Sequence, residues 1–298
     1  MSIPGIIPAP FIGAAGHPGF TVSLDGTRIF KPCDFKEIDF YETTRGRLAE
    51  DDPLARFLPS YYGKTPVAPT MNDKNRGTAQ NVISLGNIQY GLLNPNVLDV
   101  KIGRVAFEDN APEKKKKILT DRAKSTTAYQ YHFRIAGMLL QANSANLVAL
   151  DRKEVYTISP ARFPKYLERF LPGSDFIIPA FRRHLITWVI DDLTSLNQAL
   201  VGRDVYFIGS SLLIIYEGEP AQLRKMWEQY GPGGSKENLD TLKETVYRFK
   251  LIDFGHSYWS PNAARLDDFR TGLRNFAMYL TGLRDVGSAS LESIPTED

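Results

Sequence analysis

The sequence Pro-Asn-Val-Leu-Asp-Val-Lys-Ile-Gly at residues 95–103 combines an apolar run with two charged side chains. The apolar residues are mostly β-branched, which predicts a largely buried strand: Val97, Leu98, Val100 and Ile102. Asp99 and Lys101 stand two residues apart, so a strand places both side chains on the same face. A carboxylate and an ammonium held together on a rigid strand suit nucleotide chemistry, in which one binds a hydroxyl or a metal and the other a phosphate. The same spacing also suits a local ion pair, and these residues alone leave both interpretations open.

The composition of the chain is that of a globular protein. Of its 298 residues, 43% are hydrophobic and 23% are charged, which allows a substantial core in one large domain or two lobes. The 36 Lys and Arg residues nearly balance the 34 Asp and Glu residues, leaving a net charge of +2. The field of the whole molecule therefore attracts polyanions only weakly, and we predict no direct binding of nucleic acid. Any polyanion site must come from local clustering.

The single cysteine, Cys33, excludes an intramolecular disulfide framework and any multi-cysteine zinc site. An intracellular, reducing compartment follows, so we expect the nucleus, the cytoplasm or both. The segment Met1–Phe11 lacks early basic residues and is broken by prolines, which makes it a poor signal peptide. No apolar run approaches the length that spans a bilayer. We therefore expect no membrane insertion. We also expect a monomer.

A hairpin followed by a helix is predicted near the N-terminus. Two β-prone runs flank Asp25-Gly26, which is a strong hairpin signal, and Lys31 ends the second run. Asp34 and Glu37 then form a capping-box pattern at the start of a helix. In kinase-like folds, a strand lysine that binds phosphate forms an ion pair with a glutamate on a helix. Glu37 either joins such a pair or only caps the helix, and the sequence leaves this open.

Two further motifs follow in order, Ser-Ser-Leu-Leu at 210–213 and Ile-Asp-Phe at 252–254. Together with the Pro-x-x-x-Asp-x-Lys-x-Gly pattern at 95–103, they make the chain resemble the inositol polyphosphate kinase family from about Gly16 to Leu283. The resemblance implies an α+β, two-lobed kinase-like fold, of the inositol polyphosphate kinase and SAICAR synthase-like type, with ATP in the interlobe cleft. Residues 1–86 are expected to form a sheet-rich N-terminal lobe, and residues 87–298 the C-terminal lobe.

The resemblance also implies an ATP and Mg²⁺ site. Lys31 matches the family's N-terminal lobe lysine that holds ATP phosphates, and Leu85 and Ile88 lie at the expected hinge, where ATP binds. Asp99 is expected to reach the ATP ribose and the reaction centre. Asp253 leaves a predicted buried strand, as a magnesium-binding carboxylate does in a kinase-like site.

The inositol phosphate site is expected near a basic helical segment at about residues 109–135. By resemblance, Lys101 bridges the transferring phosphoryl group and the substrate, so that Asp99 and Lys101 are the catalytic pair. Lys114 matches a substrate-contacting lysine, Lys117 is a weaker match, and His256 matches a histidine near the substrate in part of the family. A lysine run also suits a solvated helix face or a nuclear-import tract. His256 equally suits a hydrogen-bonded structural role.

The expected activity is phosphoryl transfer from ATP to hydroxyls of inositol trisphosphate and tetrakisphosphate, as in the multikinase branch. The alternatives are a hexakisphosphate kinase that makes pyrophosphates, and a weakly active kinase-like scaffold. Gly86 and Asn87 favour the scaffold, because they stand where relatives often carry acidic hinge residues. A P-loop is rejected at Gly63-Lys64-Thr65, since Leu58 occupies the position of its first glycine. The chain also lacks the His-Arg-Asp catalytic loop of protein kinases.

Overall fold

The computed structural model describes residues 6–7, 20–66, 81–141, 147–151, 153–172, 179–231, 235–260 and 264–286. The segment Met1–Phe11, interpreted above as a poor signal peptide, lies outside these residues except for Ile6–Ile7. None of the described helices is both long enough and apolar enough to cross a membrane.

The first antiparallel sheet comes from the part of the chain before Gly86. Its order is β1-β2-β3-β5-β4, from strands β1 (Ile6–Ile7), β2 (Thr21–Ser23), β3 (Arg28–Pro32), β4 (Tyr61–Pro66) and β5 (Asn81–Gly86). Helix α1 (Phe35–Arg47) and the 3₁₀ turn η1 (Ala55–Phe57) lie between β3 and β4 in sequence. The hairpin predicted at Asp25-Gly26 is confirmed, because β2 pairs with β3 and Gly26 takes a φ of 74°. Gly63 and Lys64 lie on β4, so this segment has no P-loop geometry.

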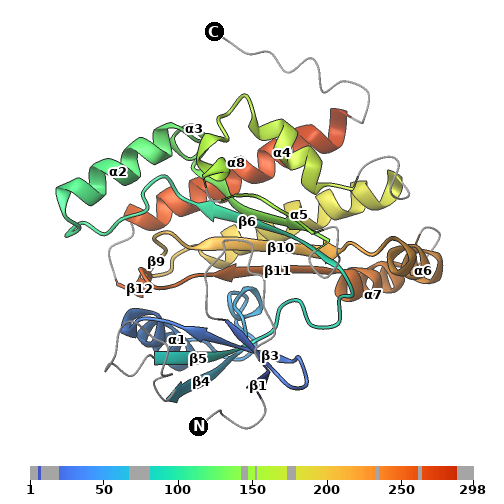
Figure 1. The fold of residues 1–298 in the computed structure, drawn as a ribbon, viewed down its shortest axis with the longest axis horizontal. Coiled ribbons are helices and arrows are strands. Elements are labelled where there is room, and N and C mark those ends of the chain that lie inside the picture. Colours follow the sequence, from blue (N-terminus) through green and yellow to red (C-terminus); the bar gives the residue numbers. More distant parts are fainter. Residues whose placement is uncertain are drawn as a thin grey trace.

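The second antiparallel sheet has the order β11-β10-β6-β7-β8, with the predicted strand β6 (Pro95–Ile102) at its centre. Its other strands are β7 (Phe133–Leu140), β8 (Val148–Ala149), β10 (Ser211–Glu217) and β11 (Tyr247–Ile252). A small sheet pairs β9 (Val205–Tyr206) with β12 (Tyr258–Trp259). Figure 1 shows the first sheet with α1 below the second sheet and its helices.

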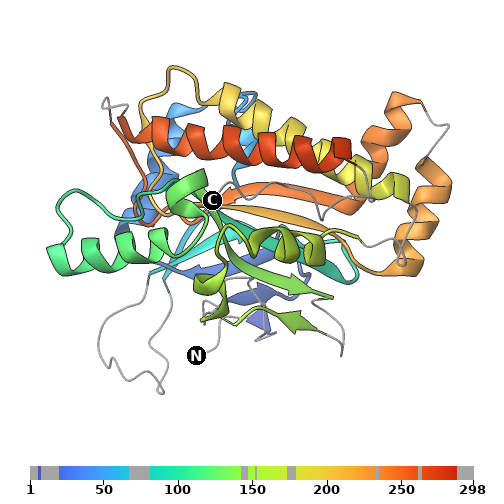
Figure 2. The same ribbon diagram turned by 90° about the horizontal axis from the view of Figure 1, so that it is seen from above.

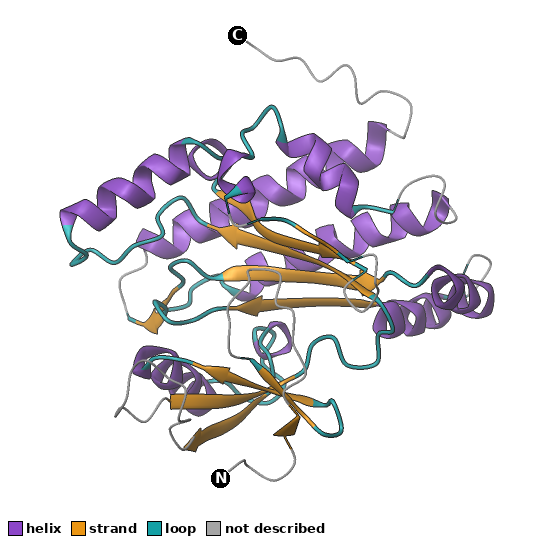
Figure 3. Cartoon of the chain, in the orientation of Figure 1, coloured by secondary structure: helices purple, strands orange, loops and turns teal. Residues whose placement is uncertain are grey.

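Helices cover one face of the second sheet (Figure 2). The longest are α5 (Pro179–Ala199) and α8 (Ala264–Val286), which pack against each other. The apolar stripe predicted on α5 is buried core, including Phe181, Leu185 and Leu193. The remaining helical elements are α2 (Glu113–Lys124), α3 (Ala128–Tyr131), η2 (Glu154–Thr157), α4 (Phe163–Phe170), α6 (Pro220–Tyr230) and α7 (Lys236–Val246). Helices and strands are thus segregated in each half of the molecule (Figure 3), which makes the fold α+β.

The linker between the two sheets is anchored at its C-terminal end by a buried carboxylate. Glu217 accepts backbone hydrogen bonds from Leu93 at 2.7 Å and Asn94 at 3.0 Å, and its side chain is almost completely buried. At the other end, the amide of Asn87 donates to the carbonyl of Gly26 at 2.8 Å. These contacts attach each end of the linker to a different sheet. A lobe boundary at residue 86 stays a prediction.

Candidate active site

Strand β6 brings Asp99 and Lys101 to one face of the second sheet. Leu98, Val100 and Ile102 belong to the main core, whereas Val97 packs in a smaller cluster with residues that include Leu213. Because side chains alternate along a strand, Asp99 and Lys101 share the face of Val97, as the spacing predicted. Both flanking strands contribute polar neighbours, since Lys101 is opposite Ser211 on β10 and Arg134 on β7.

Asp99 and Lys101 do not form an ion pair with each other. The ammonium of Lys101 instead donates to the carbonyl of Gly209 and, at 3.2 Å, to the hydroxyl of Ser211. Asp99 is 1% exposed, and its Oδ1 has no hydrogen-bond partner in the described part of the chain. Burial raises the pKa of Asp99, while the charge of Lys101 opposes this effect. A buried carboxylate oxygen without a partner is costly, so this atom fits a hydroxyl donor of a ligand.

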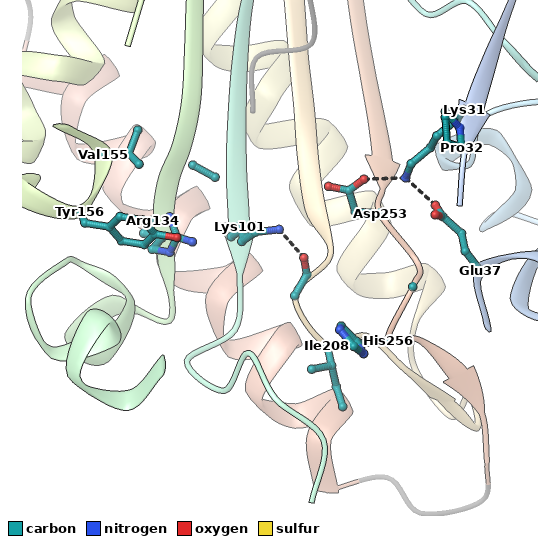
Figure 4. Close-up of a pocket in the computed structure, with 13 residues that line it drawn as sticks. Lys31, Pro32, Glu37, Lys101, Arg134, Val155, Tyr156, Ile208, Asp253 and His256 are labelled. Carbon is teal, nitrogen blue, oxygen red and sulfur yellow. Dashed lines mark hydrogen bonds and ion pairs between the residues drawn. The ribbon is translucent and has the colours of Figure 1, made fainter. Parts of the chain in front are cut away.

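A buried three-residue ion network joins the two sheets. The ammonium of Lys31 on β3 lies 2.7 Å from Glu37 Oε1 and 2.8 Å from Asp253 Oδ1 (Figure 4). Burial by itself would lower the pKa of Lys31, but the charges of Asp253 and Glu37 outweigh it and hold the pKa well above its ordinary value. Glu37 therefore pairs with Lys31, while the N-cap of α1 is Asp34, which accepts from the amide of Glu37 at 3.0 Å. Of the two alternatives left open for Glu37, the ion pair is the one formed.

Asp253 follows strand β11 in a left-handed backbone conformation with a φ of 65°. Non-glycine residues rarely adopt this region, and it persists only where neighbours hold it. Ser210 provides such a restraint, because its hydroxyl donates to the carbonyl of Asp253 at 2.9 Å and also bonds the hydroxyl of Ser257 at 2.9 Å. The two serines of the 210–213 motif thus have different partners. Ser210 restrains the backbone of Asp253, and Ser211 accepts a hydrogen bond from Lys101.

One cavity connects these groups. Its volume is about 350 Å³, and it reaches from the first sheet to the second. The lining residues come from both sheets and from the loops beside them: Lys31, Pro32, Glu37, Lys101, Arg134, Ala136, Val155, Tyr156, Ile208, Gly209, Asp253, Gly255 and His256 (Figure 4). The ion network of Lys31 lies at one end, and Lys101 and Arg134 lie toward the other. The cavity therefore has a charge-paired end and a cationic end.

His256 lies on the wall of this cavity and is held by a carboxylate. Its Nδ1 is 2.7 Å from Glu108 Oε1, and Glu108 also pairs with Lys36 at 2.6 Å. Lys36 belongs to α1, so Glu108 links the first half of the molecule to His256. Hydrogen bonds from Lys36 and His256 lower the pKa of Glu108. A charged carboxylate on Nδ1 leaves Nε2 as the ring nitrogen available to a ligand.

The other predicted site residues lie away from the cavity. Lys114 and Lys117 are exposed on α2, and Lys114 lines a separate shallow groove that also includes Ile118. Leu85 is buried in the main core, and Ile88 packs against the smaller cluster. Three residues near the cavity were not among the predicted site residues: Arg134, Tyr156 and Glu108. Arg134 carried a usable signal, because it is the one charged residue in the apolar strand β7.

The residues at the charge-paired end fit a metal–nucleotide ligand. In the described residues, no three His, Cys, Asp or Glu side chains form a group that could hold a metal by themselves. Asp253 would thus be one ligand of a magnesium ion whose other ligands are phosphate oxygens and water, which is the usual arrangement for Mg²⁺ at phosphates. Lys31, at the same end, offers an ammonium that can donate to phosphate oxygens. Asp99 is almost completely buried and is not among the residues that line the cavity.

Comparisons with known proteins agree with this geometry. A family model described as inositol polyphosphate kinase matches residues 82–285. The inositol polyphosphate multikinase of Saccharomyces cerevisiae is 26% identical over 264 residues, which cover 72% of this chain and 73% of that protein. The multikinase of Schizosaccharomyces pombe is 26% identical over 262 residues, covering 84% and 88%. The inositol hexakisphosphate kinase 2 of Oryctolagus cuniculus is 28% identical over 182 residues, covering only 55% and 40%.

The fold is likewise that of a solved kinase. The crystal structure of the S. cerevisiae inositol phosphate multikinase Ipk2 in complex with ADP and Mn²⁺ superposes with a TM-score of 0.68 at 22% identity, covering 87% of this chain and 99% of that one. This match confirms the predicted α+β kinase-like fold. Because the family model spans more than half of the chain and includes the motifs at 95–103, 210–213 and 252–254, the chain belongs to the inositol polyphosphate kinase family.

Proposed function

We propose that the chain transfers a phosphoryl group from magnesium-ATP to hydroxyls of inositol trisphosphate and tetrakisphosphate, as a multikinase. One observation carries the proposal: a single cavity joins the Lys31–Asp253 ion pair to Lys101 and Arg134. A kinase for a small polyanion needs both features, because nucleotide phosphates with their metal and an anionic acceptor must meet at one point.

The residues divide between donor and acceptor. Lys31 binds phosphate oxygens of ATP, and Asp253 binds the metal, both from the charge-paired end. ATP supplies the electrophilic phosphoryl group when it is bound. Asp99, with its buried and unpartnered Oδ1, accepts a hydrogen bond from a hydroxyl of the ligand. This assignment gives Asp253 and Asp99 different roles, while Glu37 pairs with Lys31.

Within the cationic end, Lys101 lies nearer than Arg134 to the ion network of Lys31 (Figure 4). Its carbonyl and hydroxyl partners, Gly209 and Ser211, are neutral, so its positive charge is not cancelled by a carboxylate ion pair. A cation in this state stabilises negative charge that develops during phosphoryl transfer. Arg134 and His256 face the same cavity and are suited to the phosphates of the acceptor.

The hexakisphosphate kinase alternative and the scaffold alternative give different outcomes in one experiment. The protein is incubated with ATP, Mg²⁺ and a panel of inositol phosphates from trisphosphate to hexakisphosphate, and the products are resolved by position. The proposal expects new phosphomonoesters from trisphosphate and tetrakisphosphate. Pyrophosphate products only from hexakisphosphate would replace it with the first alternative. Binding without magnesium-dependent turnover would replace it with the second.

A further inference from the structure

The ring of Tyr156 contacts two arginines from different elements. Tyr156 belongs to η2, and the guanidinium carbon of Arg122 on α2 lies 4.7 Å from its ring centroid. The guanidinium carbon of Arg134 on β7 lies 5.0 Å from the same centroid. Both distances are within the range of a cation–π interaction. The stack of Arg122, Tyr156 and Arg134 therefore joins three elements that are far apart in sequence.

The position of Tyr156 is itself restrained. Its neighbour Val155 is buried, and the carbonyl of Tyr156 accepts a hydrogen bond from the hydroxyl of Ser125 at 3.3 Å. Ser125 is the C-cap residue of α2, so η2 is attached to the end of the helix that carries Arg122. The backbone at Tyr156 is thus attached to the end of α2 by a contact that does not involve the arginines.

Among the described residues, no carboxylate forms a direct ion pair with Arg122 or Arg134, although the charge of buried Asp99 acts on Arg134. Arg134 donates a hydrogen bond to the carbonyl of Ile135 at 3.2 Å, and burial lowers its pKa. A side pocket that adjoins the main cavity is lined by both arginines together with Lys101, Arg104 and Tyr156. Lys101, Arg104, Arg122 and Arg134 thus line one side pocket, and none of the four forms an ion pair with a carboxylate of the described residues.

We propose that Arg122 and Arg134, held on the ring of Tyr156, form a subsite for phosphates of the acceptor, with Tyr156 as the positioning residue. This inference rests on the proposed function and names the part of the site that selects the substrate. A guanidinium stacked on a ring keeps its in-plane N–H groups available, and these match two oxygens of a phosphate. Two such groups favour an acceptor with at least two phosphates besides the hydroxyl that reacts.

Replacement of the ring separates positioning from other roles. Tyr156→Leu removes the π-face while keeping an apolar side chain, and Tyr156→Phe keeps the ring but removes the hydroxyl. We expect Tyr156→Leu to raise the KM for inositol trisphosphate about five- to tenfold, with the KM for ATP and kcat within about twofold of wild type. Tyr156→Phe, which keeps the ring, is expected to have the wild-type KM for inositol trisphosphate. Arg122→Met should raise the same KM, and Lys115→Met, an exposed lysine on the same helix, should not.

Binding of inositol hexakisphosphate, measured by calorimetry without ATP, gives a readout that does not need turnover. We expect weaker binding for Tyr156→Leu and Arg122→Met and unchanged binding for Tyr156→Phe and Lys115→Met, each with a normal thermal melt. Unchanged binding and KM in folded Tyr156→Leu and Arg122→Met would overturn the subsite while leaving the proposed kinase activity intact. Absence of turnover in wild type would overturn the proposed function, and the binding comparison would still decide the subsite.

Discussion

The two ends of the cavity differ in how their charges are balanced. At one end, Lys31 is buried against two carboxylates, Glu37 and Asp253, so the protein supplies its own counter-charges. At the other end, Lys101 and Arg134 have carbonyl, hydroxyl and aromatic partners, and Arg122 of the side pocket also contacts the ring of Tyr156. Ion networks stabilise the folded protein only when complete, whereas uncompensated cations gain their counter-charge from a ligand. Substitutions at the first end should affect folding and ATP together, and those at the second should affect mainly the acceptor.

Asp253→Asn tests the charge-paired end and should have the largest effect. The substitution keeps the volume of the side chain but removes the charge that pairs with Lys31 and would bind the metal. Loss of a metal-binding charge costs several kcal/mol of transition-state stabilisation, so turnover should fall by at least about a hundredfold. The measurement is turnover as a function of Mg²⁺ concentration, corrected for the folded fraction. A folded variant with near-normal turnover at limiting Mg²⁺ would remove Asp253 from this role.

Lys101→Met tests the part of the cationic end that is nearest the ion network of Lys31. The stem and its packing are retained while the charge is lost. Because Lys101 forms no ion pair with Asp99, we expect little destabilisation and a loss of turnover by orders of magnitude. The deciding quantity is kcat at saturating substrates, with a thermal melt as the control. Turnover within about threefold of wild type, which is well under 1 kcal/mol, would contradict a role in the reaction.

Asp99→Asn should stabilise the protein while reducing its activity. Burial raises the folded-state pKa of Asp99, so the ionised carboxylate destabilises the folded protein at pH values above that pKa. A neutral amide relieves this cost, so we expect a higher free energy of unfolding and a higher Tm near neutral pH. The difference should shrink as the pH falls through the folded-state pKa, because wild-type Asp99 then becomes neutral. A variant that melts lower than wild type at neutral pH would disprove the cost of burial.

The double substitution of Lys114 and Lys117 by Ala should have the smallest effect. It tests whether the acceptor site extends from the cationic end to the exposed lysines of α2. Both lysines are exposed, and contacts of exposed charges are worth about 0–1 kcal/mol. We expect the KM for inositol trisphosphate to rise by no more than about fivefold, with the KM for ATP unchanged. Initial rates are measured while one substrate is varied and the other is saturating, which gives the KM for inositol trisphosphate and the KM for ATP separately. An equal rise in both constants would place α2 outside the acceptor site.

The central strand and the order of the motifs were predictable because they depend on local pattern. The apolar run at 97–102 required a strand, and Asp99 and Lys101 then had to share a face. The hairpin at Asp25-Gly26 and the Asp34 cap follow from turn and cap chemistry in the same way. The family was also predictable, since three ordered motifs suffice to recognise it. Each of these features is determined within a few residues.

The contacts of the charged groups required the tertiary structure. The sequence allowed Lys101 to pair with Asp99, but β10 places Gly209 and Ser211 within reach of its ammonium. The lysine run at 114–117 suggested a binding role by its composition, whereas the charged residue of α2 that lines the side pocket is Arg122. Neither outcome can be read from spacing, because each depends on which distant segment lies alongside.

The sequence by itself determined the secondary structure around its motifs, the family and the identity of Lys31, Asp99, Lys101 and Asp253 as candidates. Only the tertiary structure decided that Glu37 pairs with Lys31, that Ser210 holds Asp253 and that Tyr156 joins Arg122 to Arg134. The physical reason is one of range. Hydrogen-bond preference and apolar periodicity act over a few residues, whereas the partner of a buried charge is set by the packing of whole sheets and helices.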